Sequence, residues 1–301
     1  MDASKQATTK LLARGLANVA GLLPAYLILA GLLLVSSGRQ ALAQQATKIN
    51  PSNAPSKLPS KVPSSKPSNL PSNPSNPSND VQQLLAAGQA AQDNGRFDEA
   101  IATYNRVIAL SANNARNAAV ANLKIGNAYM VQRKFENAAI GYQRAATLNP
   151  DYAEAYNNLG EALGELKQYP RAIEAFNKAF ALDPTLLKAK YNQAVTYDRM
   201  GNFRYSEFVF RNLIKSSPEY SLAYDGLAVT LSKAGRAKEA IAFHEKAIAL
   251  NPREPSYYFN CAISYLMLRN TAKALEQQEK LKEIDPAIAD RLASVIVKRQ
   301  M

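Results

Sequence analysis

A proline recurs at a fixed interval of 34 residues through the second half of the chain. The five positions in this series are Pro150, Pro184, Pro218, Pro252 and Pro286. Columns of small, apolar and aromatic residues keep the same interval. A fixed period of this length is typical of proteins that stack one small structural unit several times. The second half of the chain is therefore expected to form an extended stack and not a single globular core.

Each unit of the repeat is predicted to contain two antiparallel helices. In the third unit, a first helix carries its core residues at helical spacing, namely Tyr156, Leu159, Gly160 and Leu163. A second helix does the same with Ala172, Phe176 and Ala179. The column at Gly160 holds only glycine or alanine, which indicates a close approach of the two helices. The recurring proline cannot continue the second helix, so it marks the turn between units.

These columns resemble the tetratricopeptide repeat family, and the third unit matches its pattern best. The resemblance implies an all-α fold, a right-handed α-solenoid of about six 34-residue helix-turn-helix repeats. The predicted repeats, with four extra residues after the first, are 81–114, 119–152, 153–186, 187–220, 221–254 and 255–286. An apolar stripe within residues 287–301 predicts a capping helix at the C-terminal end of the stack.

Residues 1–43 have the pattern of a targeting segment. Lys5, Lys10 and Arg14 precede an uncharged, largely apolar run over residues 16–35, and small residues stand at Ala41 and Ala43. This order predicts a signal peptide that is cleaved before residue 44, and therefore an exported, periplasmic or extracytoplasmic protein. Because the run is long enough to span a bilayer, an uncleaved membrane anchor is the main alternative, and an organellar targeting peptide is a third.

Residues 44–80 are rich in proline, serine and asparagine and contain eight Pro-Ser pairs. Proline cannot donate a backbone hydrogen bond, and the segment has few large apolar side chains, so a disordered linker is predicted. Its main predicted role is that of a spacer. In an alternative role, its four lysines would contact a cell-wall polymer or lipid headgroups.

The rare residues that support most enzyme chemistry are almost absent. The chain has one histidine and one cysteine, too few for a metal cluster, and no phosphate-binding loop or nucleophile motif. His244 falls in the aromatic column and Cys261 in a leucine column, so both are predicted to be buried core residues. We therefore expect no catalytic residue, no metal and no cofactor.

The net charge of +12 does not indicate nucleic-acid binding. Half of the excess lies in the first 80 residues, and the remainder alternates in sign along the repeats. Such alternation is typical of a solvated surface and not of a basic stripe that follows phosphates.

One polar column is predicted to face the inside of the solenoid. Two residues before the glycine or alanine column stand Lys124, Asn158, Asn192, Gly226 and Asn260. An asparagine carboxamide can donate to a peptide carbonyl and accept from a peptide amide. In the family that the chain resembles, asparagines at this position hold the backbone of a ligand. The alternative is that asparagine is only a tolerated polar residue beside solvent.

A second set of residues overlaps that column. Asn127, Asn158 and Lys188 match positions at which related repeat proteins bind the C-terminal carboxylate of a peptide. Two members of such a clamp are missing, since Leu123 and Asn192 stand where a lysine and an arginine would be expected, although Lys124 is adjacent. A complete carboxylate clamp is therefore not predicted.

The leading functional hypothesis is a non-catalytic scaffold outside the cytoplasmic membrane that holds a peptide or a partner segment in its concave groove. The predicted peptide-binding residues are Lys124, Asn127, Asn158, Lys188, Asn192 and Asn260. The main alternative is a structural subunit that assembles with itself or with an envelope complex and binds no peptide. An accessory module for a glycan-handling enzyme is a third hypothesis.

Overall fold

The computed structural model describes residues 77–300, which belong to a compact unit spanning Asn73–Met301. This part of the chain contains helices and no strands, so the predicted all-α repeat fold is confirmed. The helices are α2 (Pro77–Asp93), α3 (Phe97–Leu110), α4 (Ala115–Val131), α5 (Phe135–Leu148), α6 (Ala153–Glu165), α7 (Tyr169–Leu182), α8 (Leu187–Arg199), α9 (Phe203–Ser216), α10 (Ser221–Lys233), α11 (Ala237–Leu250), α12 (Pro255–Met267), α13 (Thr271–Ile284) and α14 (Pro286–Gln300).

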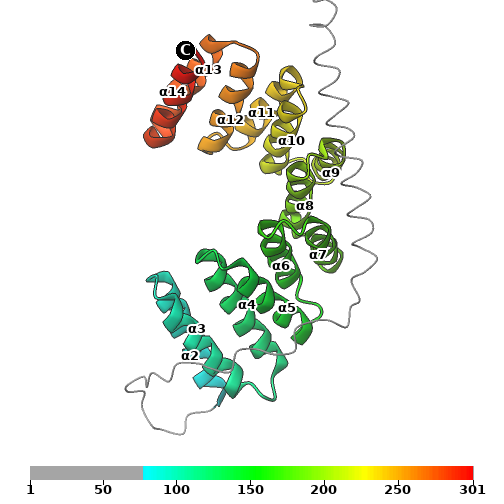
Figure 1. The fold of residues 1–301 in the computed structure, drawn as a ribbon, viewed down its shortest axis with the longest axis vertical. Helices are drawn as coiled ribbons and strands as arrows, with labels where there is room; N and C mark the ends of the chain where they lie inside the picture. The colour runs from blue at the N-terminus through cyan, green and yellow to red at the C-terminus, as the bar shows by residue number, and fades with distance from the viewer. Residues whose placement is uncertain (1–76, 301) are drawn as a thin grey trace, which may run out of the picture. The chain divides into compact units, whose positions relative to one another are not determined.

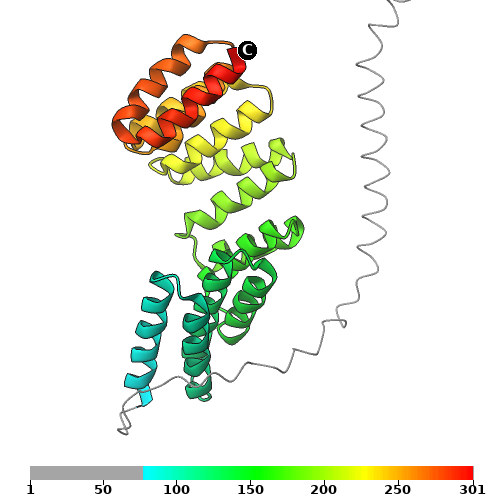
Figure 2. The ribbon, with the colours of Figure 1, turned by 60° about the vertical axis from the view of Figure 1, so that its left-hand side comes forward.

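The helices pair in chain order and the pairs stack on one another (Figures 1 and 2). Even-numbered helices from α2 to α12 are the first helices of the units, and odd-numbered helices from α3 to α13 are the second helices. Each helix packs against the next one along the chain, and first helices also contact the first helix of the following unit, as α6 does with α8. Side chains of successive first helices therefore form a continuous surface.

The first two units begin earlier than predicted. Helices α2 and α4 have 17 residues each, whereas α6, α8, α10 and α12 have 13. Helix α4 gains about one turn because Asn114 caps it, its side chain accepting a hydrogen bond from the backbone N–H of Asn117 at 3.1 Å. The four extra residues before the second unit are thus helical. Helix α2 begins at Pro77, within the predicted linker, and proline is tolerated in a first helical turn because its missing N–H has no partner there.

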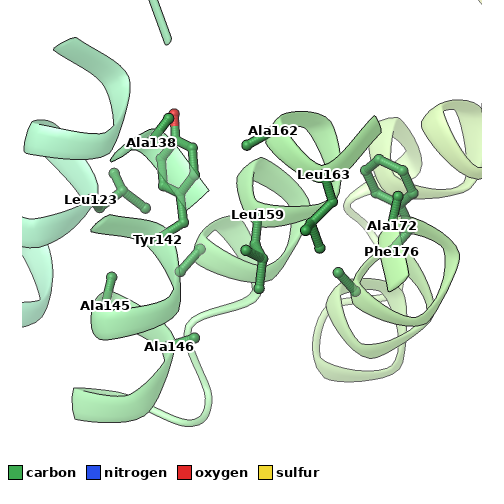
Figure 3. Packing of buried hydrophobic residues seen from close by; sticks show 12 residues of the cluster. Leu123, Ala138, Tyr142, Ala145, Ala146, Leu159, Ala162, Leu163, Ala172 and Phe176 are labelled. Atoms are coloured by element: carbon green, nitrogen blue, oxygen red, sulfur yellow. The ribbon is translucent and has the colours of Figure 1, made fainter. Parts of the chain in front are cut away.

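Buried aromatic rings fill the space between the two helices of a unit. Tyr142 and Phe176 are both 2% exposed and belong to one cluster that joins α4, α5, α6 and α7 (Figure 3). A Cβ atom added to Gly160 would lie 2.6 Å from Cε1 of Phe176. The glycine column is therefore set by the aromatic column, because each ring occupies the space that a larger side chain would need.

The turns within the units share one unusual backbone conformation. The residue before the N-cap of each second helix has a positive φ, and it is glycine at Gly95, Gly201 and Gly235 but a basic residue at Arg133, Lys167 and Arg269. Glycine adopts this left-handed conformation without steric cost, whereas a residue with a Cβ atom does so with strain. Three of the six turns therefore hold a basic side chain at a backbone position that favours glycine.

Helix α14 covers the end of the stack. It buries Ala289, Leu292 and Ile296 against α12 and α13. The predicted signal peptide or anchor (1–43) and residues 44–76 of the predicted linker lie outside the described residues. Within the described range, no helix has the length and apolarity that crossing a membrane requires.

Candidate functional site

The polar column of the first helices connects neighbouring repeats. Each of its four polar members donates a side-chain hydrogen bond to the preceding first helix. The pairs are Lys124 to Gln89 at 2.8 Å, Asn158 to Asn127 at 3.3 Å, Asn192 to Asn157 at 3.2 Å and Asn260 to Asp225 at 2.9 Å. The asparagines are thus neither purely solvated nor wholly free for a ligand. They contribute to the stacking of the units.

Polar contacts continue from this column along α4, α6 and α8. Asn127 accepts a second hydrogen bond, from the hydroxyl of Tyr142 at 2.8 Å. Burial raises the pKa of that hydroxyl, so it stays protonated and remains a donor. Asn157 donates to Asn158 at 3.0 Å and to Glu161 at 2.9 Å. Glu161 also contacts Lys188 and Asn192, so four of the predicted site residues, Asn127, Asn158, Lys188 and Asn192, belong to one polar network.

Glu161 is the centre of this network. Its Oε1 atom accepts from Asn192 at 2.9 Å and forms an ion pair with Lys188 at 2.7 Å. The predicted cation for a peptide carboxylate is therefore already paired with a carboxylate of the protein. A carboxylate ligand at Lys188 would have to compete with Glu161. This competition reduces the binding free energy that the ligand could gain from an ion pair with Lys188.

A pocket of about 530 Å³ opens beside this network. Helices α6 and α8 supply most of its lining, and the end of α4, the turn after it, the start of α5 and one residue of α7 supply the rest. The lining residues are Met130, Val131, Arg133, Phe135, Gly160, Glu161, Gly164, Glu165, Phe176, Lys188, Asn192, Val195, Thr196 and Arg199. We call this cavity the α6–α8 pocket. Of the predicted site residues, Lys188 and Asn192 line it. Lys124, Asn127 and Asn158 do not, and Asn260 lies on α12 beside Asp225.

The chemistry of the neighbours fixes how Asn192 presents its carboxamide. A carboxylate only accepts hydrogen bonds, so the amide nitrogen of Asn192, and not its oxygen, must face Glu161. The same nitrogen donates to Asn157, and both of its hydrogens are then used. The carbonyl oxygen, Oδ1, has no hydrogen-bond partner among the described residues and is left to accept from a ligand N–H.

Several pocket residues lie outside the columns from which the site was predicted. Glu165 and Arg199 form an ion pair at 2.7 Å and stand 34 residues apart, one repeat period. That spacing was a usable signal, because equivalent positions on neighbouring first helices are close in space. Arg133 belongs to a turn, and no helical column could have placed it beside the pocket.

His244 and Cys261 are both buried at 0% exposure. His244 is hydrogen-bonded, with Nδ1 2.7 Å from Asp225 Oδ1 and Nε2 3.1 Å from Ser264 Oγ. It therefore replaces an aromatic ring with polar contacts that join α10, α11 and α12. Burial raises the pKa of Cys261 to about 12. Across residues 77–300, no group of histidine, cysteine, aspartate and glutamate side chains is placed to hold a metal ion.

Comparison with known proteins agrees with the repeat structure. Models described as tetratricopeptide repeat match residues 153–186 and residues 85–146 and 191–255, and one described as TPR repeat matches residues 126–167. Among curated proteins, anaphase-promoting complex subunit 3 of Schizosaccharomyces pombe is 24% identical over 162 residues, or 54% of this chain and 24% of that protein. Mitochondrial import receptor subunit TOM70 of Homo sapiens is 25% identical over 199 residues, or 64% of this chain and 33% of that protein. The chain thus spans a third or less of the length of these relatives.

Two solved structures have a similar fold. PilW, described as a widely conserved type IV pilus biogenesis factor, is 21% identical with a TM-score of 0.59, covering 72% of this chain and 98% of PilW. A tetratricopeptide repeat protein from Parabacteroides merdae is 20% identical with a TM-score of 0.58, covering 72% of this chain and 84% of that one. At these identities the likeness shows the fold alone. The repeat models together match more than half of the residues, and the chain belongs to the tetratricopeptide repeat family.

Proposed function

We propose that the protein is a non-catalytic scaffold that binds an extended peptide, or an extended segment of a partner protein, in the α6–α8 pocket. The observation that carries this proposal is Asn192, which lines a pocket of about 530 Å³ and whose Oδ1 atom has no hydrogen-bond partner among the described residues. An oxygen in that position can accept from a peptide N–H, a group that every peptide other than polyproline offers.

The floor of the pocket suits a peptide backbone. Gly164 of α6 lines the pocket, and a Cβ atom added there would meet only Arg199, at 3.9 Å. The absence of a side chain at Gly164 lets a ligand backbone approach the helix closely at this point. Val195 and Met130 add apolar surface, so the pocket offers both polar and apolar contacts.

The names of the relatives support the same class of function. They include an import receptor subunit and a subunit of a multiprotein complex, roles that depend on binding other proteins. Because this chain covers only part of those proteins, binding of a protein partner by this chain is a proposal.

The test compares two asparagines from the same column. Asn192→Ala and Asn260→Ala each remove a hydrogen bond to a carboxylate on the preceding first helix, but only Asn192 lines the pocket. Peptides selected from a random library on the full chain would be titrated by calorimetry. We expect Asn192→Ala to weaken binding by about 0.5–1.5 kcal/mol for peptides of different sequence, because a backbone N–H is common to them all. Asn260→Ala should bind like the wild type.

Thermal unfolding of both variants is the control for stability, since both lose a contact between repeats. Equal affinities of wild type and Asn192→Ala, with similar melting temperatures, would contradict a role for the pocket. The ligand would then bind elsewhere on the chain.

We also propose that the protein is exported and that residues 44–76 separate the repeats from the membrane or cell wall. The sequence of residues 1–43 supports this proposal. Mass spectrometry of the native protein should find an N-terminus at Gln44. An intact Met1 in a carbonate-resistant membrane fraction would favour the anchor instead, and detection only in the soluble cytoplasm would refute both forms.

Self-association is the second candidate function, and one surface favours it. Tyr205 and Phe208 on α9 are 56% and 62% exposed, and large exposed aromatic side chains favour protein contacts. If copies of the chain meet at α9, Phe208→Ser should lower the mass measured by light scattering at high concentration. A monomer at every concentration would exclude this candidate.

A further inference from the structure

Arg133 is the residue that sets the charge of the α6–α8 pocket. It lies in the turn between α4 and α5 and lines the pocket together with Phe135, over whose ring its guanidinium carbon stands 5.6 Å from the centroid. A cation above an aromatic ring keeps its hydrogen-bond donors free, because the ring face holds it without using them.

The other two cations of the pocket are neutralised. Lys188 pairs with Glu161 and Arg199 pairs with Glu165, each at 2.7 Å. Within residues 77–300, no carboxylate lies within ion-pair distance of Arg133. The lining therefore carries one uncompensated positive charge, and it is located at Arg133 and not at Lys188.

The backbone conformation of Arg133 is shared with the equivalent turn residues of other units and does not by itself single it out. Its φ is +58°, at a turn position where Gly95, Gly201 and Gly235 stand in other units. A basic residue near the C-terminus of a first helix is favoured by the helix dipole, which accounts for a cation at this turn in general. Lys167 and Arg269 share that advantage and the same conformation, but neither lines the pocket. What distinguishes Arg133 is its place at the pocket without a carboxylate partner.

We propose that Arg133 binds a carboxylate of the peptide held in the α6–α8 pocket, so that the pocket selects acidic ligands through this turn. This inference rests on the proposed peptide-binding function. The guanidinium presents several donors in one plane, which suits a carboxylate with two acceptor oxygens. Acidic side chains and a free C-terminus share this chemistry, and the experiment separates them.

The probes are two positional-scanning pools of N-acetylated heptapeptides, one with a free C-terminal carboxylate and one with a C-terminal amide. Both are applied to the full chain and to two variants, Arg133→Gly and Arg269→Gly. Glycine is the residue found at the same turn in three other units, so each variant keeps the turn and loses only the side chain. Arg269→Gly is the matched control, because it makes the same change at the same φ away from this pocket.

We expect the wild type to prefer aspartate or glutamate at one position of the amide pool, or to prefer the free-acid pool over the amide pool. The first result identifies a side-chain carboxylate and the second a C-terminal one. For the selected peptide, Arg133→Gly should lose about three- to tenfold in affinity, the range of a charge-assisted contact that remains partly exposed. Replacing the peptide carboxylate by its amide should cost the wild type a similar factor, and should cost Arg133→Gly almost nothing.

Two results would overturn the inference, and they have different meanings. If peptides bind through Asn192 but Arg133→Gly keeps the preference of the wild type for the carboxylate, then Arg133 is not the anchor and the peptide-binding function stands. If neither pool contains a peptide whose affinity depends on Asn192, the proposed function fails and this inference fails with it.

Discussion

Two glycines of α6 allow the packing of a repeat to be tested within one helix. Gly160 and Gly164 lie four residues apart on the same helix, and neither has a positive φ. A methyl group at Gly160 would lie 2.6, 2.7 and 2.8 Å from three ring carbons of Phe176. A methyl group at Gly164 would meet only the guanidinium of Arg199 at 3.9 Å. The two alanine variants therefore share their chemistry and differ in the space available.

The expected energies follow from these distances. Alanine stabilises a helix interior relative to glycine by about 0.5–1 kcal/mol, and Gly164→Ala should gain close to that amount. At Gly160, the same gain is offset by overpacking. The ring of Phe176, which is 2% exposed, would have to move by several tenths of an ångström within a filled core, at a cost of about 1–3 kcal/mol. We expect Gly160→Ala to be less stable than Gly164→Ala by about 1–3 kcal/mol.

Urea denaturation followed by the helical circular dichroism signal measures this difference. Both variants and the wild type should be compared as full chains, because stacked repeats share stability across their interfaces. Equal midpoints for the two alanine variants would refute the view that the aromatic ring sets the glycine column. Gly160→Leu, which adds more atoms at the same place, should be at least as destabilising as Gly160→Ala.

Two further predictions concern the buried residues that enzyme chemistry would have used. His244→Phe restores the aromatic residue of other units but removes the hydrogen bonds to Asp225 and Ser264. We therefore expect the free energy of unfolding, measured by urea denaturation, to fall by about 1–3 kcal/mol. A raised midpoint would show that these hydrogen bonds give no net stability. Cys261, with its pKa raised to about 12 by burial, should not react with iodoacetamide at pH 8 until urea unfolds the chain, and fast labelling of the folded chain would contradict this. The folded state disfavours the thiolate of Cys261, so the neutral thiol is the form that favours folding. The stability that the raised pKa of Cys261 contributes should be complete below pH 9 and should decrease as the pH rises towards 12.

The repeat period was sufficient to predict the fold because stacking uses the same residue types at the same positions in every unit. Tyr142, Phe176 and Phe210 repeat at intervals of 34 and are all buried. The period could not show that α4 begins at Ala115, since that depends on the local cap by Asn114 and not on any repeated position. Helix ends are decided by such single contacts, so they vary between units whose cores are alike.

The candidate site was less predictable, because its charges are set by pairs that cross from one unit to the next. Lys188 was singled out from its position alone, and its pairing with Glu161 depends on the side chains present on two different helices. The uncompensated cation, Arg133, belongs to a turn, where the sequence pattern predicts glycine and gives no direction for a side chain. Column patterns describe what each unit contributes to the stack. They do not describe the balance of charge in a pocket shared by three units.

Stacking and ligand binding are coupled at Asn192. Both hydrogens of its amide are used to join α8 to α6, so the contacts between repeats fix the orientation of its carboxamide beside the pocket. Any movement of α8 relative to α6 would displace that carboxamide and the Lys188–Glu161 pair together. A ligand that binds only the stacked form should stabilise the junction of α6 and α8. The free energy of this stabilisation should grow as the ligand concentration rises above the dissociation constant. Hydrogen exchange in α6 and α8 should therefore slow when peptide is added, while exchange in α12 and α14 should change less, because repeats contact only their neighbours. Uniform slowing along all helices would show that the repeats unfold as one unit and that binding cannot be assigned to this junction from stability alone.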